Sequence, residues 1–566
     1  MTNLKQTLAD AISKLINQPD VTAEKITECF DTPPAPEMGD IALACFKLSK
    51  LLRKSPMMIA EELSTALSSA PPVGISKIVN MGGYLNFFLA DSHRIGILRE
   101  MLSLGENYGR NEIGKGKTMV IDYSSPNIAK RFHIGHLGTT IIGNSIKLIH
   151  RFSGYNTIGI NYLGDWGTQY GKLVVSFKKW GNEETIRKVG IEELNRLYVL
   201  FGTESEKDPS LNDEARAEFA KLEAGDEENL RLWRIFKEIS LKEYMLTYDL
   251  LGVSFDSFNG ESFYSDKMPA VVDELKEKNL LKIDDGASLV DLEEFHMPPC
   301  LILKSDGSSL YPTRDIAAAL WRKKEYKFDK CVYVTSAGQS LHFAQWFKVI
   351  GLMGYDWEDQ LVHVPYGTFS INGEKIASRT GNVVLLDDLF KEAIEKAGEI
   401  IREKNPDLEN KDEIARDVGV GAVIFNSLSS GRIKDVNFNW DEALNFDGNT
   451  GPYAQYTFAR ACSILNKADA FSCPVDTVLC AEEKELITTL SLFPERIVRS
   501  LTEYEPSIIT RFVLDLCQSF NRFYNACSIR NAEGDEKALR LSLCQAVKNV
   551  LGTALHLIGL RTPEKI

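Results

Sequence analysis

Two histidines, His133 and His136, stand three residues apart in the run SSPNIAKRFHIGHLG (124–138). A histidine pair can bind a metal ion, transfer protons or bind phosphate. Zinc requires three or four ligands, and neither a cysteine nor a third histidine lies nearby in the sequence. A metal site is therefore disfavoured. Two histidines packed in the core are the other alternative. The glycine between the pair is typical of neither a metal site nor a packed core.

The position of the pair favours phosphate binding. A buried strand is predicted just before it and a helix is predicted from Gly135 onward. Imidazole N–H groups would therefore lie beside the free backbone N–H groups at the positive end of the helix dipole. Gly135 has no Cβ and lets a ligand approach the backbone, and Lys130 adds a positive charge.

The elements that position these residues form a βαβ unit. The run TMVIDYS (118–124) is rich in β-branched and aromatic residues, and it lies between a Gly- and Lys-rich linker (105–117) and Pro126. The next segment has helical spacing, and NTIGINYLG (156–164) is the next strand. Strand, helix and strand in this order predict a parallel sheet, whose carboxyl edge is where ligands bind.

Other segments predict further domains. The first 110 residues mix helical patterns with strand-like runs, and Ser55-Pro56 is typical of a helix start. Charged residues at helical spacing (203–245) predict a helical insertion. Strand patterns return at 300–304 and 331–336, and from about residue 410 the pattern is almost wholly helical, with breaks at 436–444 and 472–476.

Composition sets the broad class. The chain has 566 residues, 44% hydrophobic and 25% charged, which predicts several globular domains. A net charge of −14 argues against a sequence-independent DNA or RNA binder but leaves local basic surfaces open. The ten cysteines include no C-x-x-C pair, and the N-terminal run has the spacing of a core helix, not of a signal peptide. No apolar run is long enough for a membrane span. We expect most of the cysteines to be buried thiols in a reducing compartment, and therefore a cytoplasmic protein.

The motif H-I-G-H after the first strand resembles the signature of class I aminoacyl-tRNA synthetases. These enzymes carry a later K-M-S-K-S loop over the ATP phosphates, and Lys375-Ile376-Ala377-Ser378-Arg379 stands in that place. Here Ser378 replaces the second lysine. Arginyl-tRNA synthetases often lack that lysine and carry one just before H-x-G-H, where Lys130 stands. The exchange keeps a cation near the phosphates, which is what the transition state requires.

Further stretches resemble arginyl-tRNA synthetases, in order from about residue 35 to the C-terminus. The resemblance implies an α/β protein whose catalytic domain is a Rossmann-type parallel sheet with the H-x-G-H motif, between an N-terminal α+β domain and an all-helical anticodon-binding domain. The expected boundaries are 1–112 for the tRNA-elbow domain, 113–395 for the catalytic domain with an insertion at about 175–298, 396–449 for a helical connector and 450–566 for the anticodon-binding domain. The matching stretches are SSPNIAK (124–130), NYLGDWGTQYGKL (161–173), SLKEYMLTYDLLGVSFDSFNGESFY (240–264), YPTRDIAAAL (311–320), SAGQSLHFAQWF (336–347) and TGPYAQYTFARACSIL (450–465).

The resemblance implies an arginine--tRNA ligase, which activates L-arginine with ATP and Mg²⁺ and then transfers it to tRNA(Arg). The attacking group is a carboxylate, so catalysis needs positioning and charge neutralisation and no general base. We expect no metal ligand from protein side chains. The ATP-binding residues implied are His133, Gly135, His136, Lys130, Lys375 and Ser378, of which the histidines and lysines are catalytic.

An arginine pocket needs a carboxylate and flat surfaces for the planar guanidinium group. Tyr311 and Asp315 are four residues apart, on one face if helical, and match the family's guanidinium contacts. Alternatively, Asp315 could be an ion-pair partner of Arg314. Asn127 and Gln339 match residues that hold the backbone groups of the amino acid. Asp122 matches an acidic residue near its amino group, although it could instead be a strand-end carboxylate with local hydrogen bonds.

Four residues are implied as tRNA contacts. Asn86, in GYLNFFL (83–89), resembles the element that meets the tRNA elbow, where at least one of Phe87 and Phe88 should be buried. Aromatic and arginine side chains at helical spacing in the last domain can stack on unpaired bases. Core packing is an equal alternative for Tyr456. The three residues in the last domain are Tyr453, Tyr456 and Arg460.

The chain departs from the family pattern at three positions near the site. Arg131 replaces a usual proline, Gly138 stands where arginine is common, and Ala377 replaces the loop serine. The first can change how Lys130 is held, and the second removes a charge carried by a helix. The third removes a hydroxyl group. None removes a group that the chemistry must have, so we expect them to affect rate more than the existence of activity.

Other functions compete with this hypothesis. A relative that binds tRNA without charging it would not need the complete set of site residues. A small H-x-G-H nucleotidyltransferase would not need the helical C-terminal domain, and a scaffold would not need polar residues converging on one cleft. An enzyme for lysine is disfavoured by a pocket built for a bidentate cation. We expect tRNA(Arg), arginine and ATP as partners of a monomer, without membrane or DNA.

Overall fold

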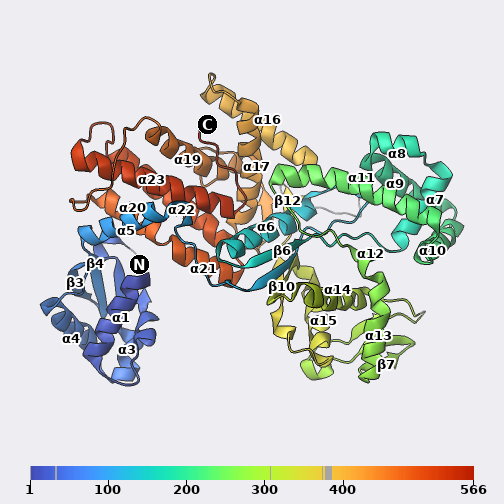
Figure 1. Cartoon of the computed structure of the whole chain (residues 1–566), viewed down its shortest axis with the longest axis horizontal. Coiled ribbons are helices and arrows are strands. Elements are labelled where there is room, and N and C mark those ends of the chain that lie inside the picture. Colours follow the sequence, from blue (N-terminus) through green and yellow to red (C-terminus); the bar gives the residue numbers. More distant parts are fainter. Residues whose placement is uncertain (1, 32, 34, 306, 372–373, 376–384) are drawn as a thin grey trace.

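The N-terminal domain is an antiparallel sheet with helices packed on it, at the lower left of Figure 1. The computed structural model describes the whole chain except residues 1, 32, 34, 306, 372–373 and 376–384. The predicted helix start is confirmed, because the Ser55 side chain accepts a hydrogen bond from the Met58 N–H at 3.3 Å and Pro56 follows it. The elements are α1 (Thr2–Ile16), α2 (Ala23–Thr27), β1 (Phe30–Asp31), β2 (Ile41–Ala44), α3 (Cys45–Leu52), α4 (Pro56–Ser69), β3 (Ile75–Met81) and β4 (Tyr84–Leu89), with strand order β1-β2-β4-β3.

A four-stranded parallel sheet lies at the centre of the molecule (Figure 1). The predicted βαβ unit is confirmed, since β5 and β6 pair in parallel and α6 connects them. A second crossover, α15, connects β10 and β11. All four carboxyl ends therefore meet at one edge. The elements are β5 (Thr118–Asp122), α6 (Leu137–Phe152), β6 (Asn156–Ile160), β10 (Lys330–Ser336), α15 (Ser340–Leu352) and β11 (Leu361–Tyr366), in the order β11-β10-β5-β6.

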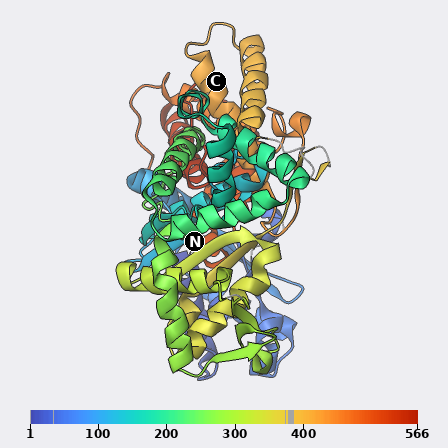
Figure 2. The ribbon, with the colours of Figure 1, turned by 90° about the vertical axis from the view of Figure 1, so that its right-hand side faces the viewer.

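Two lobes are inserted between β6 and β10. The first is helical and the second combines an antiparallel sheet with helices; Figures 1 and 2 show them above and below one another. The predicted helical insertion and the predicted strand at 300–304 are both confirmed. The first lobe contains α7 (Thr168–Trp180), α8 (Glu183–Val189), α9 (Ile191–Lys207), α10 (Ser210–Glu223) and α11 (Glu227–Leu251). The second contains α12 (Glu261–Tyr264), α13 (Met268–Glu277), β7 (Leu281–Asp284), β8 (Ala287–Val290), β9 (Cys300–Leu303) and α14 (Tyr311–Tyr326).

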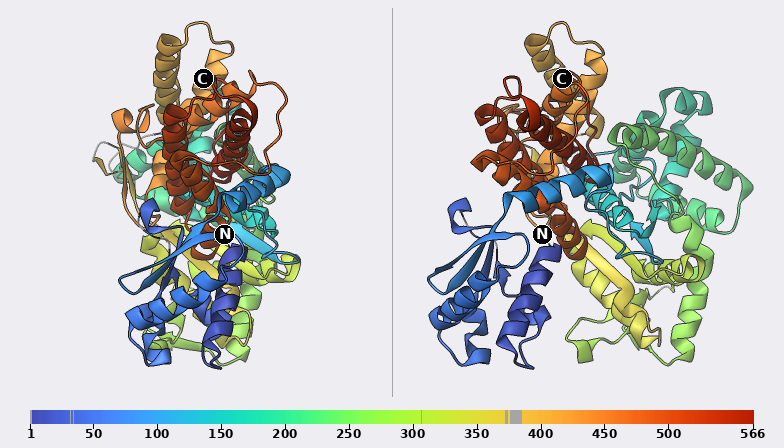
Figure 3. Two further views of the ribbon diagram at one scale, coloured as in Figure 1. Left: turned by 90° about the vertical axis from the view of Figure 1, so that its left-hand side faces the viewer. Right: turned by 60° about the vertical axis from the view of Figure 1, so that its left-hand side comes forward.

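The C-terminal part is helical, as the sequence predicts. Figure 3 shows these helices above the N-terminal domain, with α5 (Asp91–Leu104) running between the two. Among the described residues from 410 onward the exception is β14, which pairs in parallel with β12 at the predicted break near residue 436. The elements are β12 (Phe369–Ile371), β13 (Glu374–Lys375), α16 (Leu386–Lys404), α17 (Lys411–Ser429), β14 (Val436–Phe438), α18 (Trp440–Ala443), α19 (Gly451–Leu465), α20 (Ala481–Ser491), α21 (Phe493–Glu503), α22 (Ser507–Ala526) and α23 (Gly534–Leu557).

Apolar burial divides the chain into separate cores. The N-terminal domain has its own cluster, which ends at Leu89, and a larger cluster begins at Ile95 and continues through α6 into the C-terminal helices. The prediction that one of the paired phenylalanines is buried is confirmed by Phe87, and most cysteine thiols are buried as expected. Among the described helices none combines the length and apolar character needed to cross a membrane.

Candidate active site

A cavity of about 510 Å³ opens at the carboxyl edge of the parallel sheet. Its walls come from the end of β5, the loop before α6, the start of α14 and the segment after β10. The fold thus brings together residues that are more than 200 positions apart in the sequence. Seven of the predicted site residues line it: Asp122, Asn127, Gly135, His136, Tyr311, Asp315 and Gln339.

The loop between β5 and α6 has an unusual backbone. Ser124, Ser125 and Ala129 have φ angles of +72°, +51° and +64°, a left-handed region that non-glycine residues rarely adopt. Such conformations persist only where surrounding contacts hold them. Ser124 is held from the sheet side, because its N–H donates to Thr139 Oγ1 at 3.0 Å and that hydroxyl donates to the Val334 carbonyl at 2.7 Å.

Helix α11 of the insertion holds the same loop from the other side. Ser240, Tyr244 and Tyr248 are spaced four residues apart and therefore lie on one face. Ser240 Oγ accepts from the Ala129 N–H at 2.8 Å, and the Tyr248 hydroxyl lies 2.8 Å from Ser124 Oγ. This contact was not among the sequence predictions, although the spacing S-x-x-x-Y-x-x-x-Y places the three side chains on one helix face. The insertion therefore shapes the site.

The two histidines lie against each other at the start of α6, with ring centroids 3.9 Å apart. His133 Nδ1 accepts from the Gly135 N–H at 3.1 Å, and His136 Nδ1 accepts from the His133 N–H at 3.3 Å. Each neutral ring therefore carries its proton on Nε2 and can donate it to a ligand. Burial lowers the pKa of His136 to about 3, and burial together with the charge of Lys130 lowers the pKa of His133.

Lys130 and His133 are outside the set of described residues that line the cavity. The Lys130 ammonium lies 5.3 Å from the centroid of the Tyr198 ring, on α9 of the insertion. Its neighbour Arg131 lies 3.8 Å from Glu192 and 4.0 Å from Asp387. The arginine that replaces the usual proline thus lies between the insertion and the start of α16.

Asp122 already has a partner inside the cavity wall. Its Oδ2 lies 2.8 Å from Arg322 Nη1, and its Oδ1 accepts from Ser125 Oγ at 2.9 Å. Arg322 is fully buried among the rings of Tyr162, Tyr264 and Tyr333. Burial raises the pKa of Asp122, and the guanidinium group opposes that shift. The local hydrogen bonds that the sequence left as an alternative are present, and Asp122 also faces the cavity.

The first turns of α14 form another wall. Tyr311 and Asp315 both line the cavity, as expected for residues four apart in a helix. Arg314 is not the partner of Asp315, since its Nη1 lies 2.8 Å from Glu261 Oε1. Asp315 Oδ2 instead lies 2.6 Å from His342 Nε2. Burial raises the pKa of Glu261 to about 7, while Arg314 lowers it. Glu261 and His342 also line the cavity, although neither was among the predicted site residues.

The segment that follows the second motif lies beside the start of the first motif. Residues 376–384, with Ser378, lie outside the described part of the chain. The backbone of Lys375 pairs with that of Ser370 in the β12–β13 ladder, and its side chain is outside the described set. Just after this segment, the Leu386 N–H donates to the Phe132 carbonyl at 3.1 Å. The chain that follows the second motif therefore contacts the residue just before the first motif.

Gly138 has a packing reason that the sequence did not reveal. A Cβ atom at this position would lie 2.3 Å from Phe369 Cε2 and 3.0 Å from the Tyr366 ring. Phe369, in β12, occupies the space that a larger side chain would need. The loss of the usual arginine is therefore accompanied by an aromatic side chain in its place.

The predicted tRNA contacts have different surroundings. Asn86 is buried at 4% exposure, and its Oδ1 has no hydrogen-bond partner among the described residues. Tyr456 is 38% exposed, so its side chain lies at the surface and not in the core. The Arg460 guanidinium lies 5.0 Å from the Tyr456 ring, and the Tyr453 hydroxyl accepts from Asn521 at 2.8 Å. Tyr453, Tyr456 and Arg460 lie on one face of α19.

Known families match all three parts of the chain. The family "tRNA synthetases class I (R), catalytic domain" matches residues 98–440, "DALR anticodon binding domain" matches 454–566, and "Arginyl tRNA synthetase N terminal domain" matches 2–89. An arginine--tRNA ligase of Alkaliphilus metalliredigens is 49% identical over 100% of both chains. One from Clostridium beijerinckii is 50% identical over 99% of this chain and 100% of its own.

Solved structures agree over the full length. The arginyl-tRNA synthetase of Thermus thermophilus has a TM-score of 0.84 at 26% identity and covers 100% of this chain and 99% of its own. That of Plasmodium falciparum has a TM-score of 0.81 at 25% identity and covers 99% of both chains. The order of the domains, the parallel sheet with its H-I-G-H segment and these relatives agree, and the chain belongs to the arginyl-tRNA synthetase family of class I.

Proposed function

We propose that this protein is an arginine--tRNA ligase. The observation that carries the proposal is one cavity that Gly135 and His136 of the histidine motif line together with Asp315. In the first reaction an oxygen of the arginine carboxylate attacks the α-phosphorus of ATP. The bond from that phosphorus to the bridging oxygen breaks, and pyrophosphate leaves with the electron pair. A ribose hydroxyl of tRNA(Arg), which the class I resemblance suggests is the 2′-OH, then attacks the adenylate carbonyl, and AMP leaves.

The site residues divide this work between them. Nε2–H donors of His133 and His136 stabilise the phosphate oxygens, at a helix start whose dipole favours anions. Lys130 and Lys375 supply positive charge, with Ser378 in the same loop. Asp315 and Tyr311 bind the guanidinium group, and the remaining groups hold the ammonium and carboxylate of the substrate. These remaining residues are Asp122, Asn127 and Gln339.

ATP enters as its Mg²⁺ complex. The described carboxylates that line the cavity are each engaged by a nearby group: Asp122 by Arg322, Glu261 by Arg314 and Asp315 by His342. This supports a magnesium ion that is held by the phosphates of ATP and not by a cage of protein ligands.

The other domains bind the tRNA. Residues 1–112 contact the elbow of the tRNA through the region of Asn86, and residues 450–566 bind the anticodon through Tyr453, Tyr456 and Arg460. The exposed stack of Tyr456 and Arg460 is suited to unpaired bases. The protein acts as a monomer in the cytoplasm.

The test is charging of total tRNA with each of the twenty amino acids in labelled form. Acid-stable label on tRNA with arginine alone is the expected result. Charging of the tRNA with lysine, or no charging with any amino acid, contradicts the proposal.

A further inference from the structure

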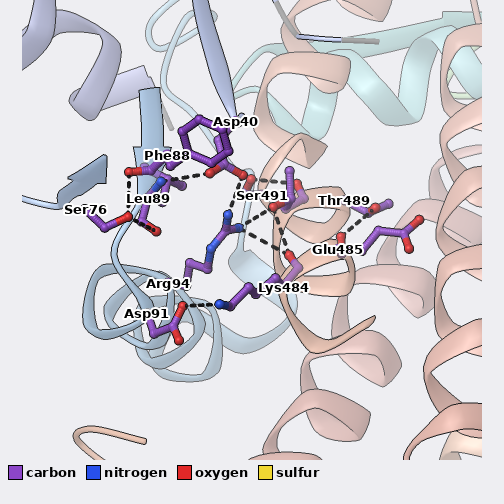
Figure 4. A network of polar contacts seen from close by, with 11 residues as sticks. Asp40, Ser76, Phe88, Leu89, Asp91, Arg94, Lys484, Glu485, Thr489 and Ser491 are labelled. Carbon is purple, nitrogen blue, oxygen red and sulfur yellow. Dashed lines mark hydrogen bonds and ion pairs between the residues drawn. The ribbon is translucent and has the colours of Figure 1, made fainter. Parts of the chain in front are cut away.

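The N-terminal domain meets the helical domain through a buried arginine (Figure 4). The apolar core of the N-terminal domain ends at Leu89, whereas Ile95 and Leu98 of α5 belong to the core of the remaining chain. Helix α5 also packs on α20 and α23. Residues 2–89 therefore form one packed body, and α5 belongs to the second body, which is the rest of the chain. The first body contacts the second at α5.

Arg94, in the first turn of α5, contacts both bodies. Its Nη2 lies 2.5 Å from Asp40 Oδ1 of the N-terminal domain. Its Nη1 donates to Thr488 Oγ1 at 2.6 Å and to the Lys484 carbonyl at 3.3 Å, both on α20. Figure 4 shows the guanidinium group between Asp40 and Lys484. Arg94 is only 6% exposed, so solvent screens these contacts little.

Asp40 also binds the end of a strand of the N-terminal sheet. Its second oxygen, Oδ2, accepts from the backbone N–H of Leu89 at 2.8 Å, at the end of β4. Next to it, Asp91 lies 2.9 Å from the Lys484 ammonium and accepts from the Leu479 N–H at 3.2 Å. The end of β4 and the start of α5 are thus tied to α20 on both sides of the chain connection.

The interface has few other means of fixing the domain. A cavity of about 810 Å³ lies between the two bodies, so apolar packing between them is interrupted here; its lining includes Asp40, Phe88, Arg94 and Thr488. Among the described residues, the other ion pair between residues 2–89 and the rest of the chain is Lys5–Glu495, at 3.6 Å. Glu495 is 47% exposed, and exposed pairs stabilise little.

We propose that Arg94 is a positioning residue for tRNA binding. By joining Asp40 to Thr488 it fixes the orientation of the N-terminal domain on the helical domain, so that both present one continuous surface to a single tRNA. A planar guanidinium group carries donors on separate nitrogens that reach Asp40 and α20 together, whereas a lysine has its three donors on one nitrogen. A domain that is already oriented avoids the entropy cost of ordering when the tRNA binds. This inference rests on the proposed function of the protein.

The test compares four full-length variants in steady-state aminoacylation: Arg94→Met, Arg94→Lys, Thr488→Val and Lys5→Met. Arg94→Met is expected to raise KM for tRNA by about 5-fold to 150-fold, the usual range of coupling between sites. Its kcat at saturating tRNA and its KM for arginine and ATP should stay as in the unaltered protein. Arg94→Lys should rescue only part of the effect. Lys5→Met, the control at the exposed pair, should match the unaltered protein.

Thr488→Val guards against a folding defect, because it removes one acceptor and leaves the Arg94–Asp40 pair intact. It is expected to raise KM for tRNA in the same direction by a smaller factor. An unchanged KM for tRNA in folded Arg94→Met, or in Thr488→Val when Arg94→Met does not fold, overturns the inference. A fall in kcat together with an unchanged KM also overturns it. Absence of charging by the unaltered protein would instead reject the proposed function.

Discussion

The hydroxyl of Tyr244 lies 2.6 Å from the backbone carbonyl oxygen of Lys130. The same hydroxyl lies 2.7 Å from the carbonyl of Asn127, so one O–H group is shared between two carbonyls of the loop before the histidine motif. Tyr244 is fully buried on α11. The insertion therefore controls the backbone that carries two predicted substrate contacts.

Replacing this hydroxyl should slow activation. In Tyr244→Phe the ring remains but both carbonyls lose their donor, which costs about 1 kcal/mol of stability. Displacement of the loop should lower kcat for ATP–pyrophosphate exchange by about tenfold to a hundredfold. Tyr198→Phe, at the ring under the Lys130 ammonium, is the matched control and should keep its rate. Equal rates for Tyr244→Phe and the unaltered protein would show that the loop does not need this contact.

The histidine pair should act without changing its charge. Because the pKa of His136 is lowered to about 3 by burial, the ring stays neutral over the range where an ordinary histidine titrates. The rate of arginine activation should therefore show no ionisation of this group between about pH 5 and 8. His136→Ala should lower kcat by about 100-fold to 1,000-fold, the cost of one preorganised donor. A pH profile with an inflection near pH 6.5 that disappears in His136→Asn would contradict a neutral donor.

The lowered pKa of His136 also makes the stability of the protein depend on pH. Protonation is disfavoured in the folded state, while the unfolded chain titrates near pH 6.5. The contribution of His136 to stability is therefore complete above about pH 6.5 and is lost as the pH falls below it. Fully buried His150, with a pKa lowered to about 4 by burial, acts in the same direction. Urea unfolding at several pH values measures this. The free energy of unfolding of the unaltered protein should fall more steeply below about pH 6.5 than that of His150→Gln.

Asp315 should decide the choice of amino acid. In Asp315→Asn the guanidinium group loses its charged partner, and KM for arginine should rise about 100-fold or more. His342→Gln keeps a side-chain donor toward Asp315 and should have a smaller effect, of about tenfold at most. KM for ATP is the internal control, since Asp315 faces the amino acid and not the phosphates in our proposal. An Asp315→Asn enzyme with an unchanged KM for arginine would place the guanidinium group elsewhere.

Gly138 should tolerate no side chain in the present packing. Gly138→Ala places a Cβ against the Phe369 ring and should destabilise the protein by about 1–3 kcal/mol. Gly202→Ala, in α9 with open space around it, is the control and should be neutral or stabilising by up to about 1 kcal/mol. The loss in Gly138→Ala should be smaller in a Phe369→Leu background, measured as a double-mutant cycle. Additive effects would mean that Phe369 does not fill this space.

Much of the fold could be predicted from local pattern. The βαβ unit around β5 and the histidine motif was visible because strand and helix periodicities differ and turn residues separate them. Tyr311 and Asp315 were expected on one face if their segment is helical; they lie in α14, and both residues line the cavity. What local pattern could not provide was partners from distant segments. Arg322 and His342 contact the predicted residues Asp122 and Asp315, and Glu261 contacts Arg314. No short-range signal connects these pairs.

Two residues illustrate the limit further. Gly138 could be read from the sequence only as a lost arginine, because the Phe369 ring that fills the space comes from a strand more than 200 residues later. Asn86 matched a family position, but its burial depends on how β2 and β3 pair with β4 on both sides. Local sequence carries periodicity and caps, whereas the closeness of such distant partners is a property of the folded chain.

In our proposal the cavity at the sheet edge activates arginine. This activity can be measured as ATP–pyrophosphate exchange with each of the twenty amino acids, with and without total tRNA. We predict exchange with arginine and with no other amino acid, and a requirement for tRNA would mean that the RNA completes the active site. Absence of exchange with arginine even with tRNA, or exchange with lysine at a similar rate, would rule out an arginine site in this cavity.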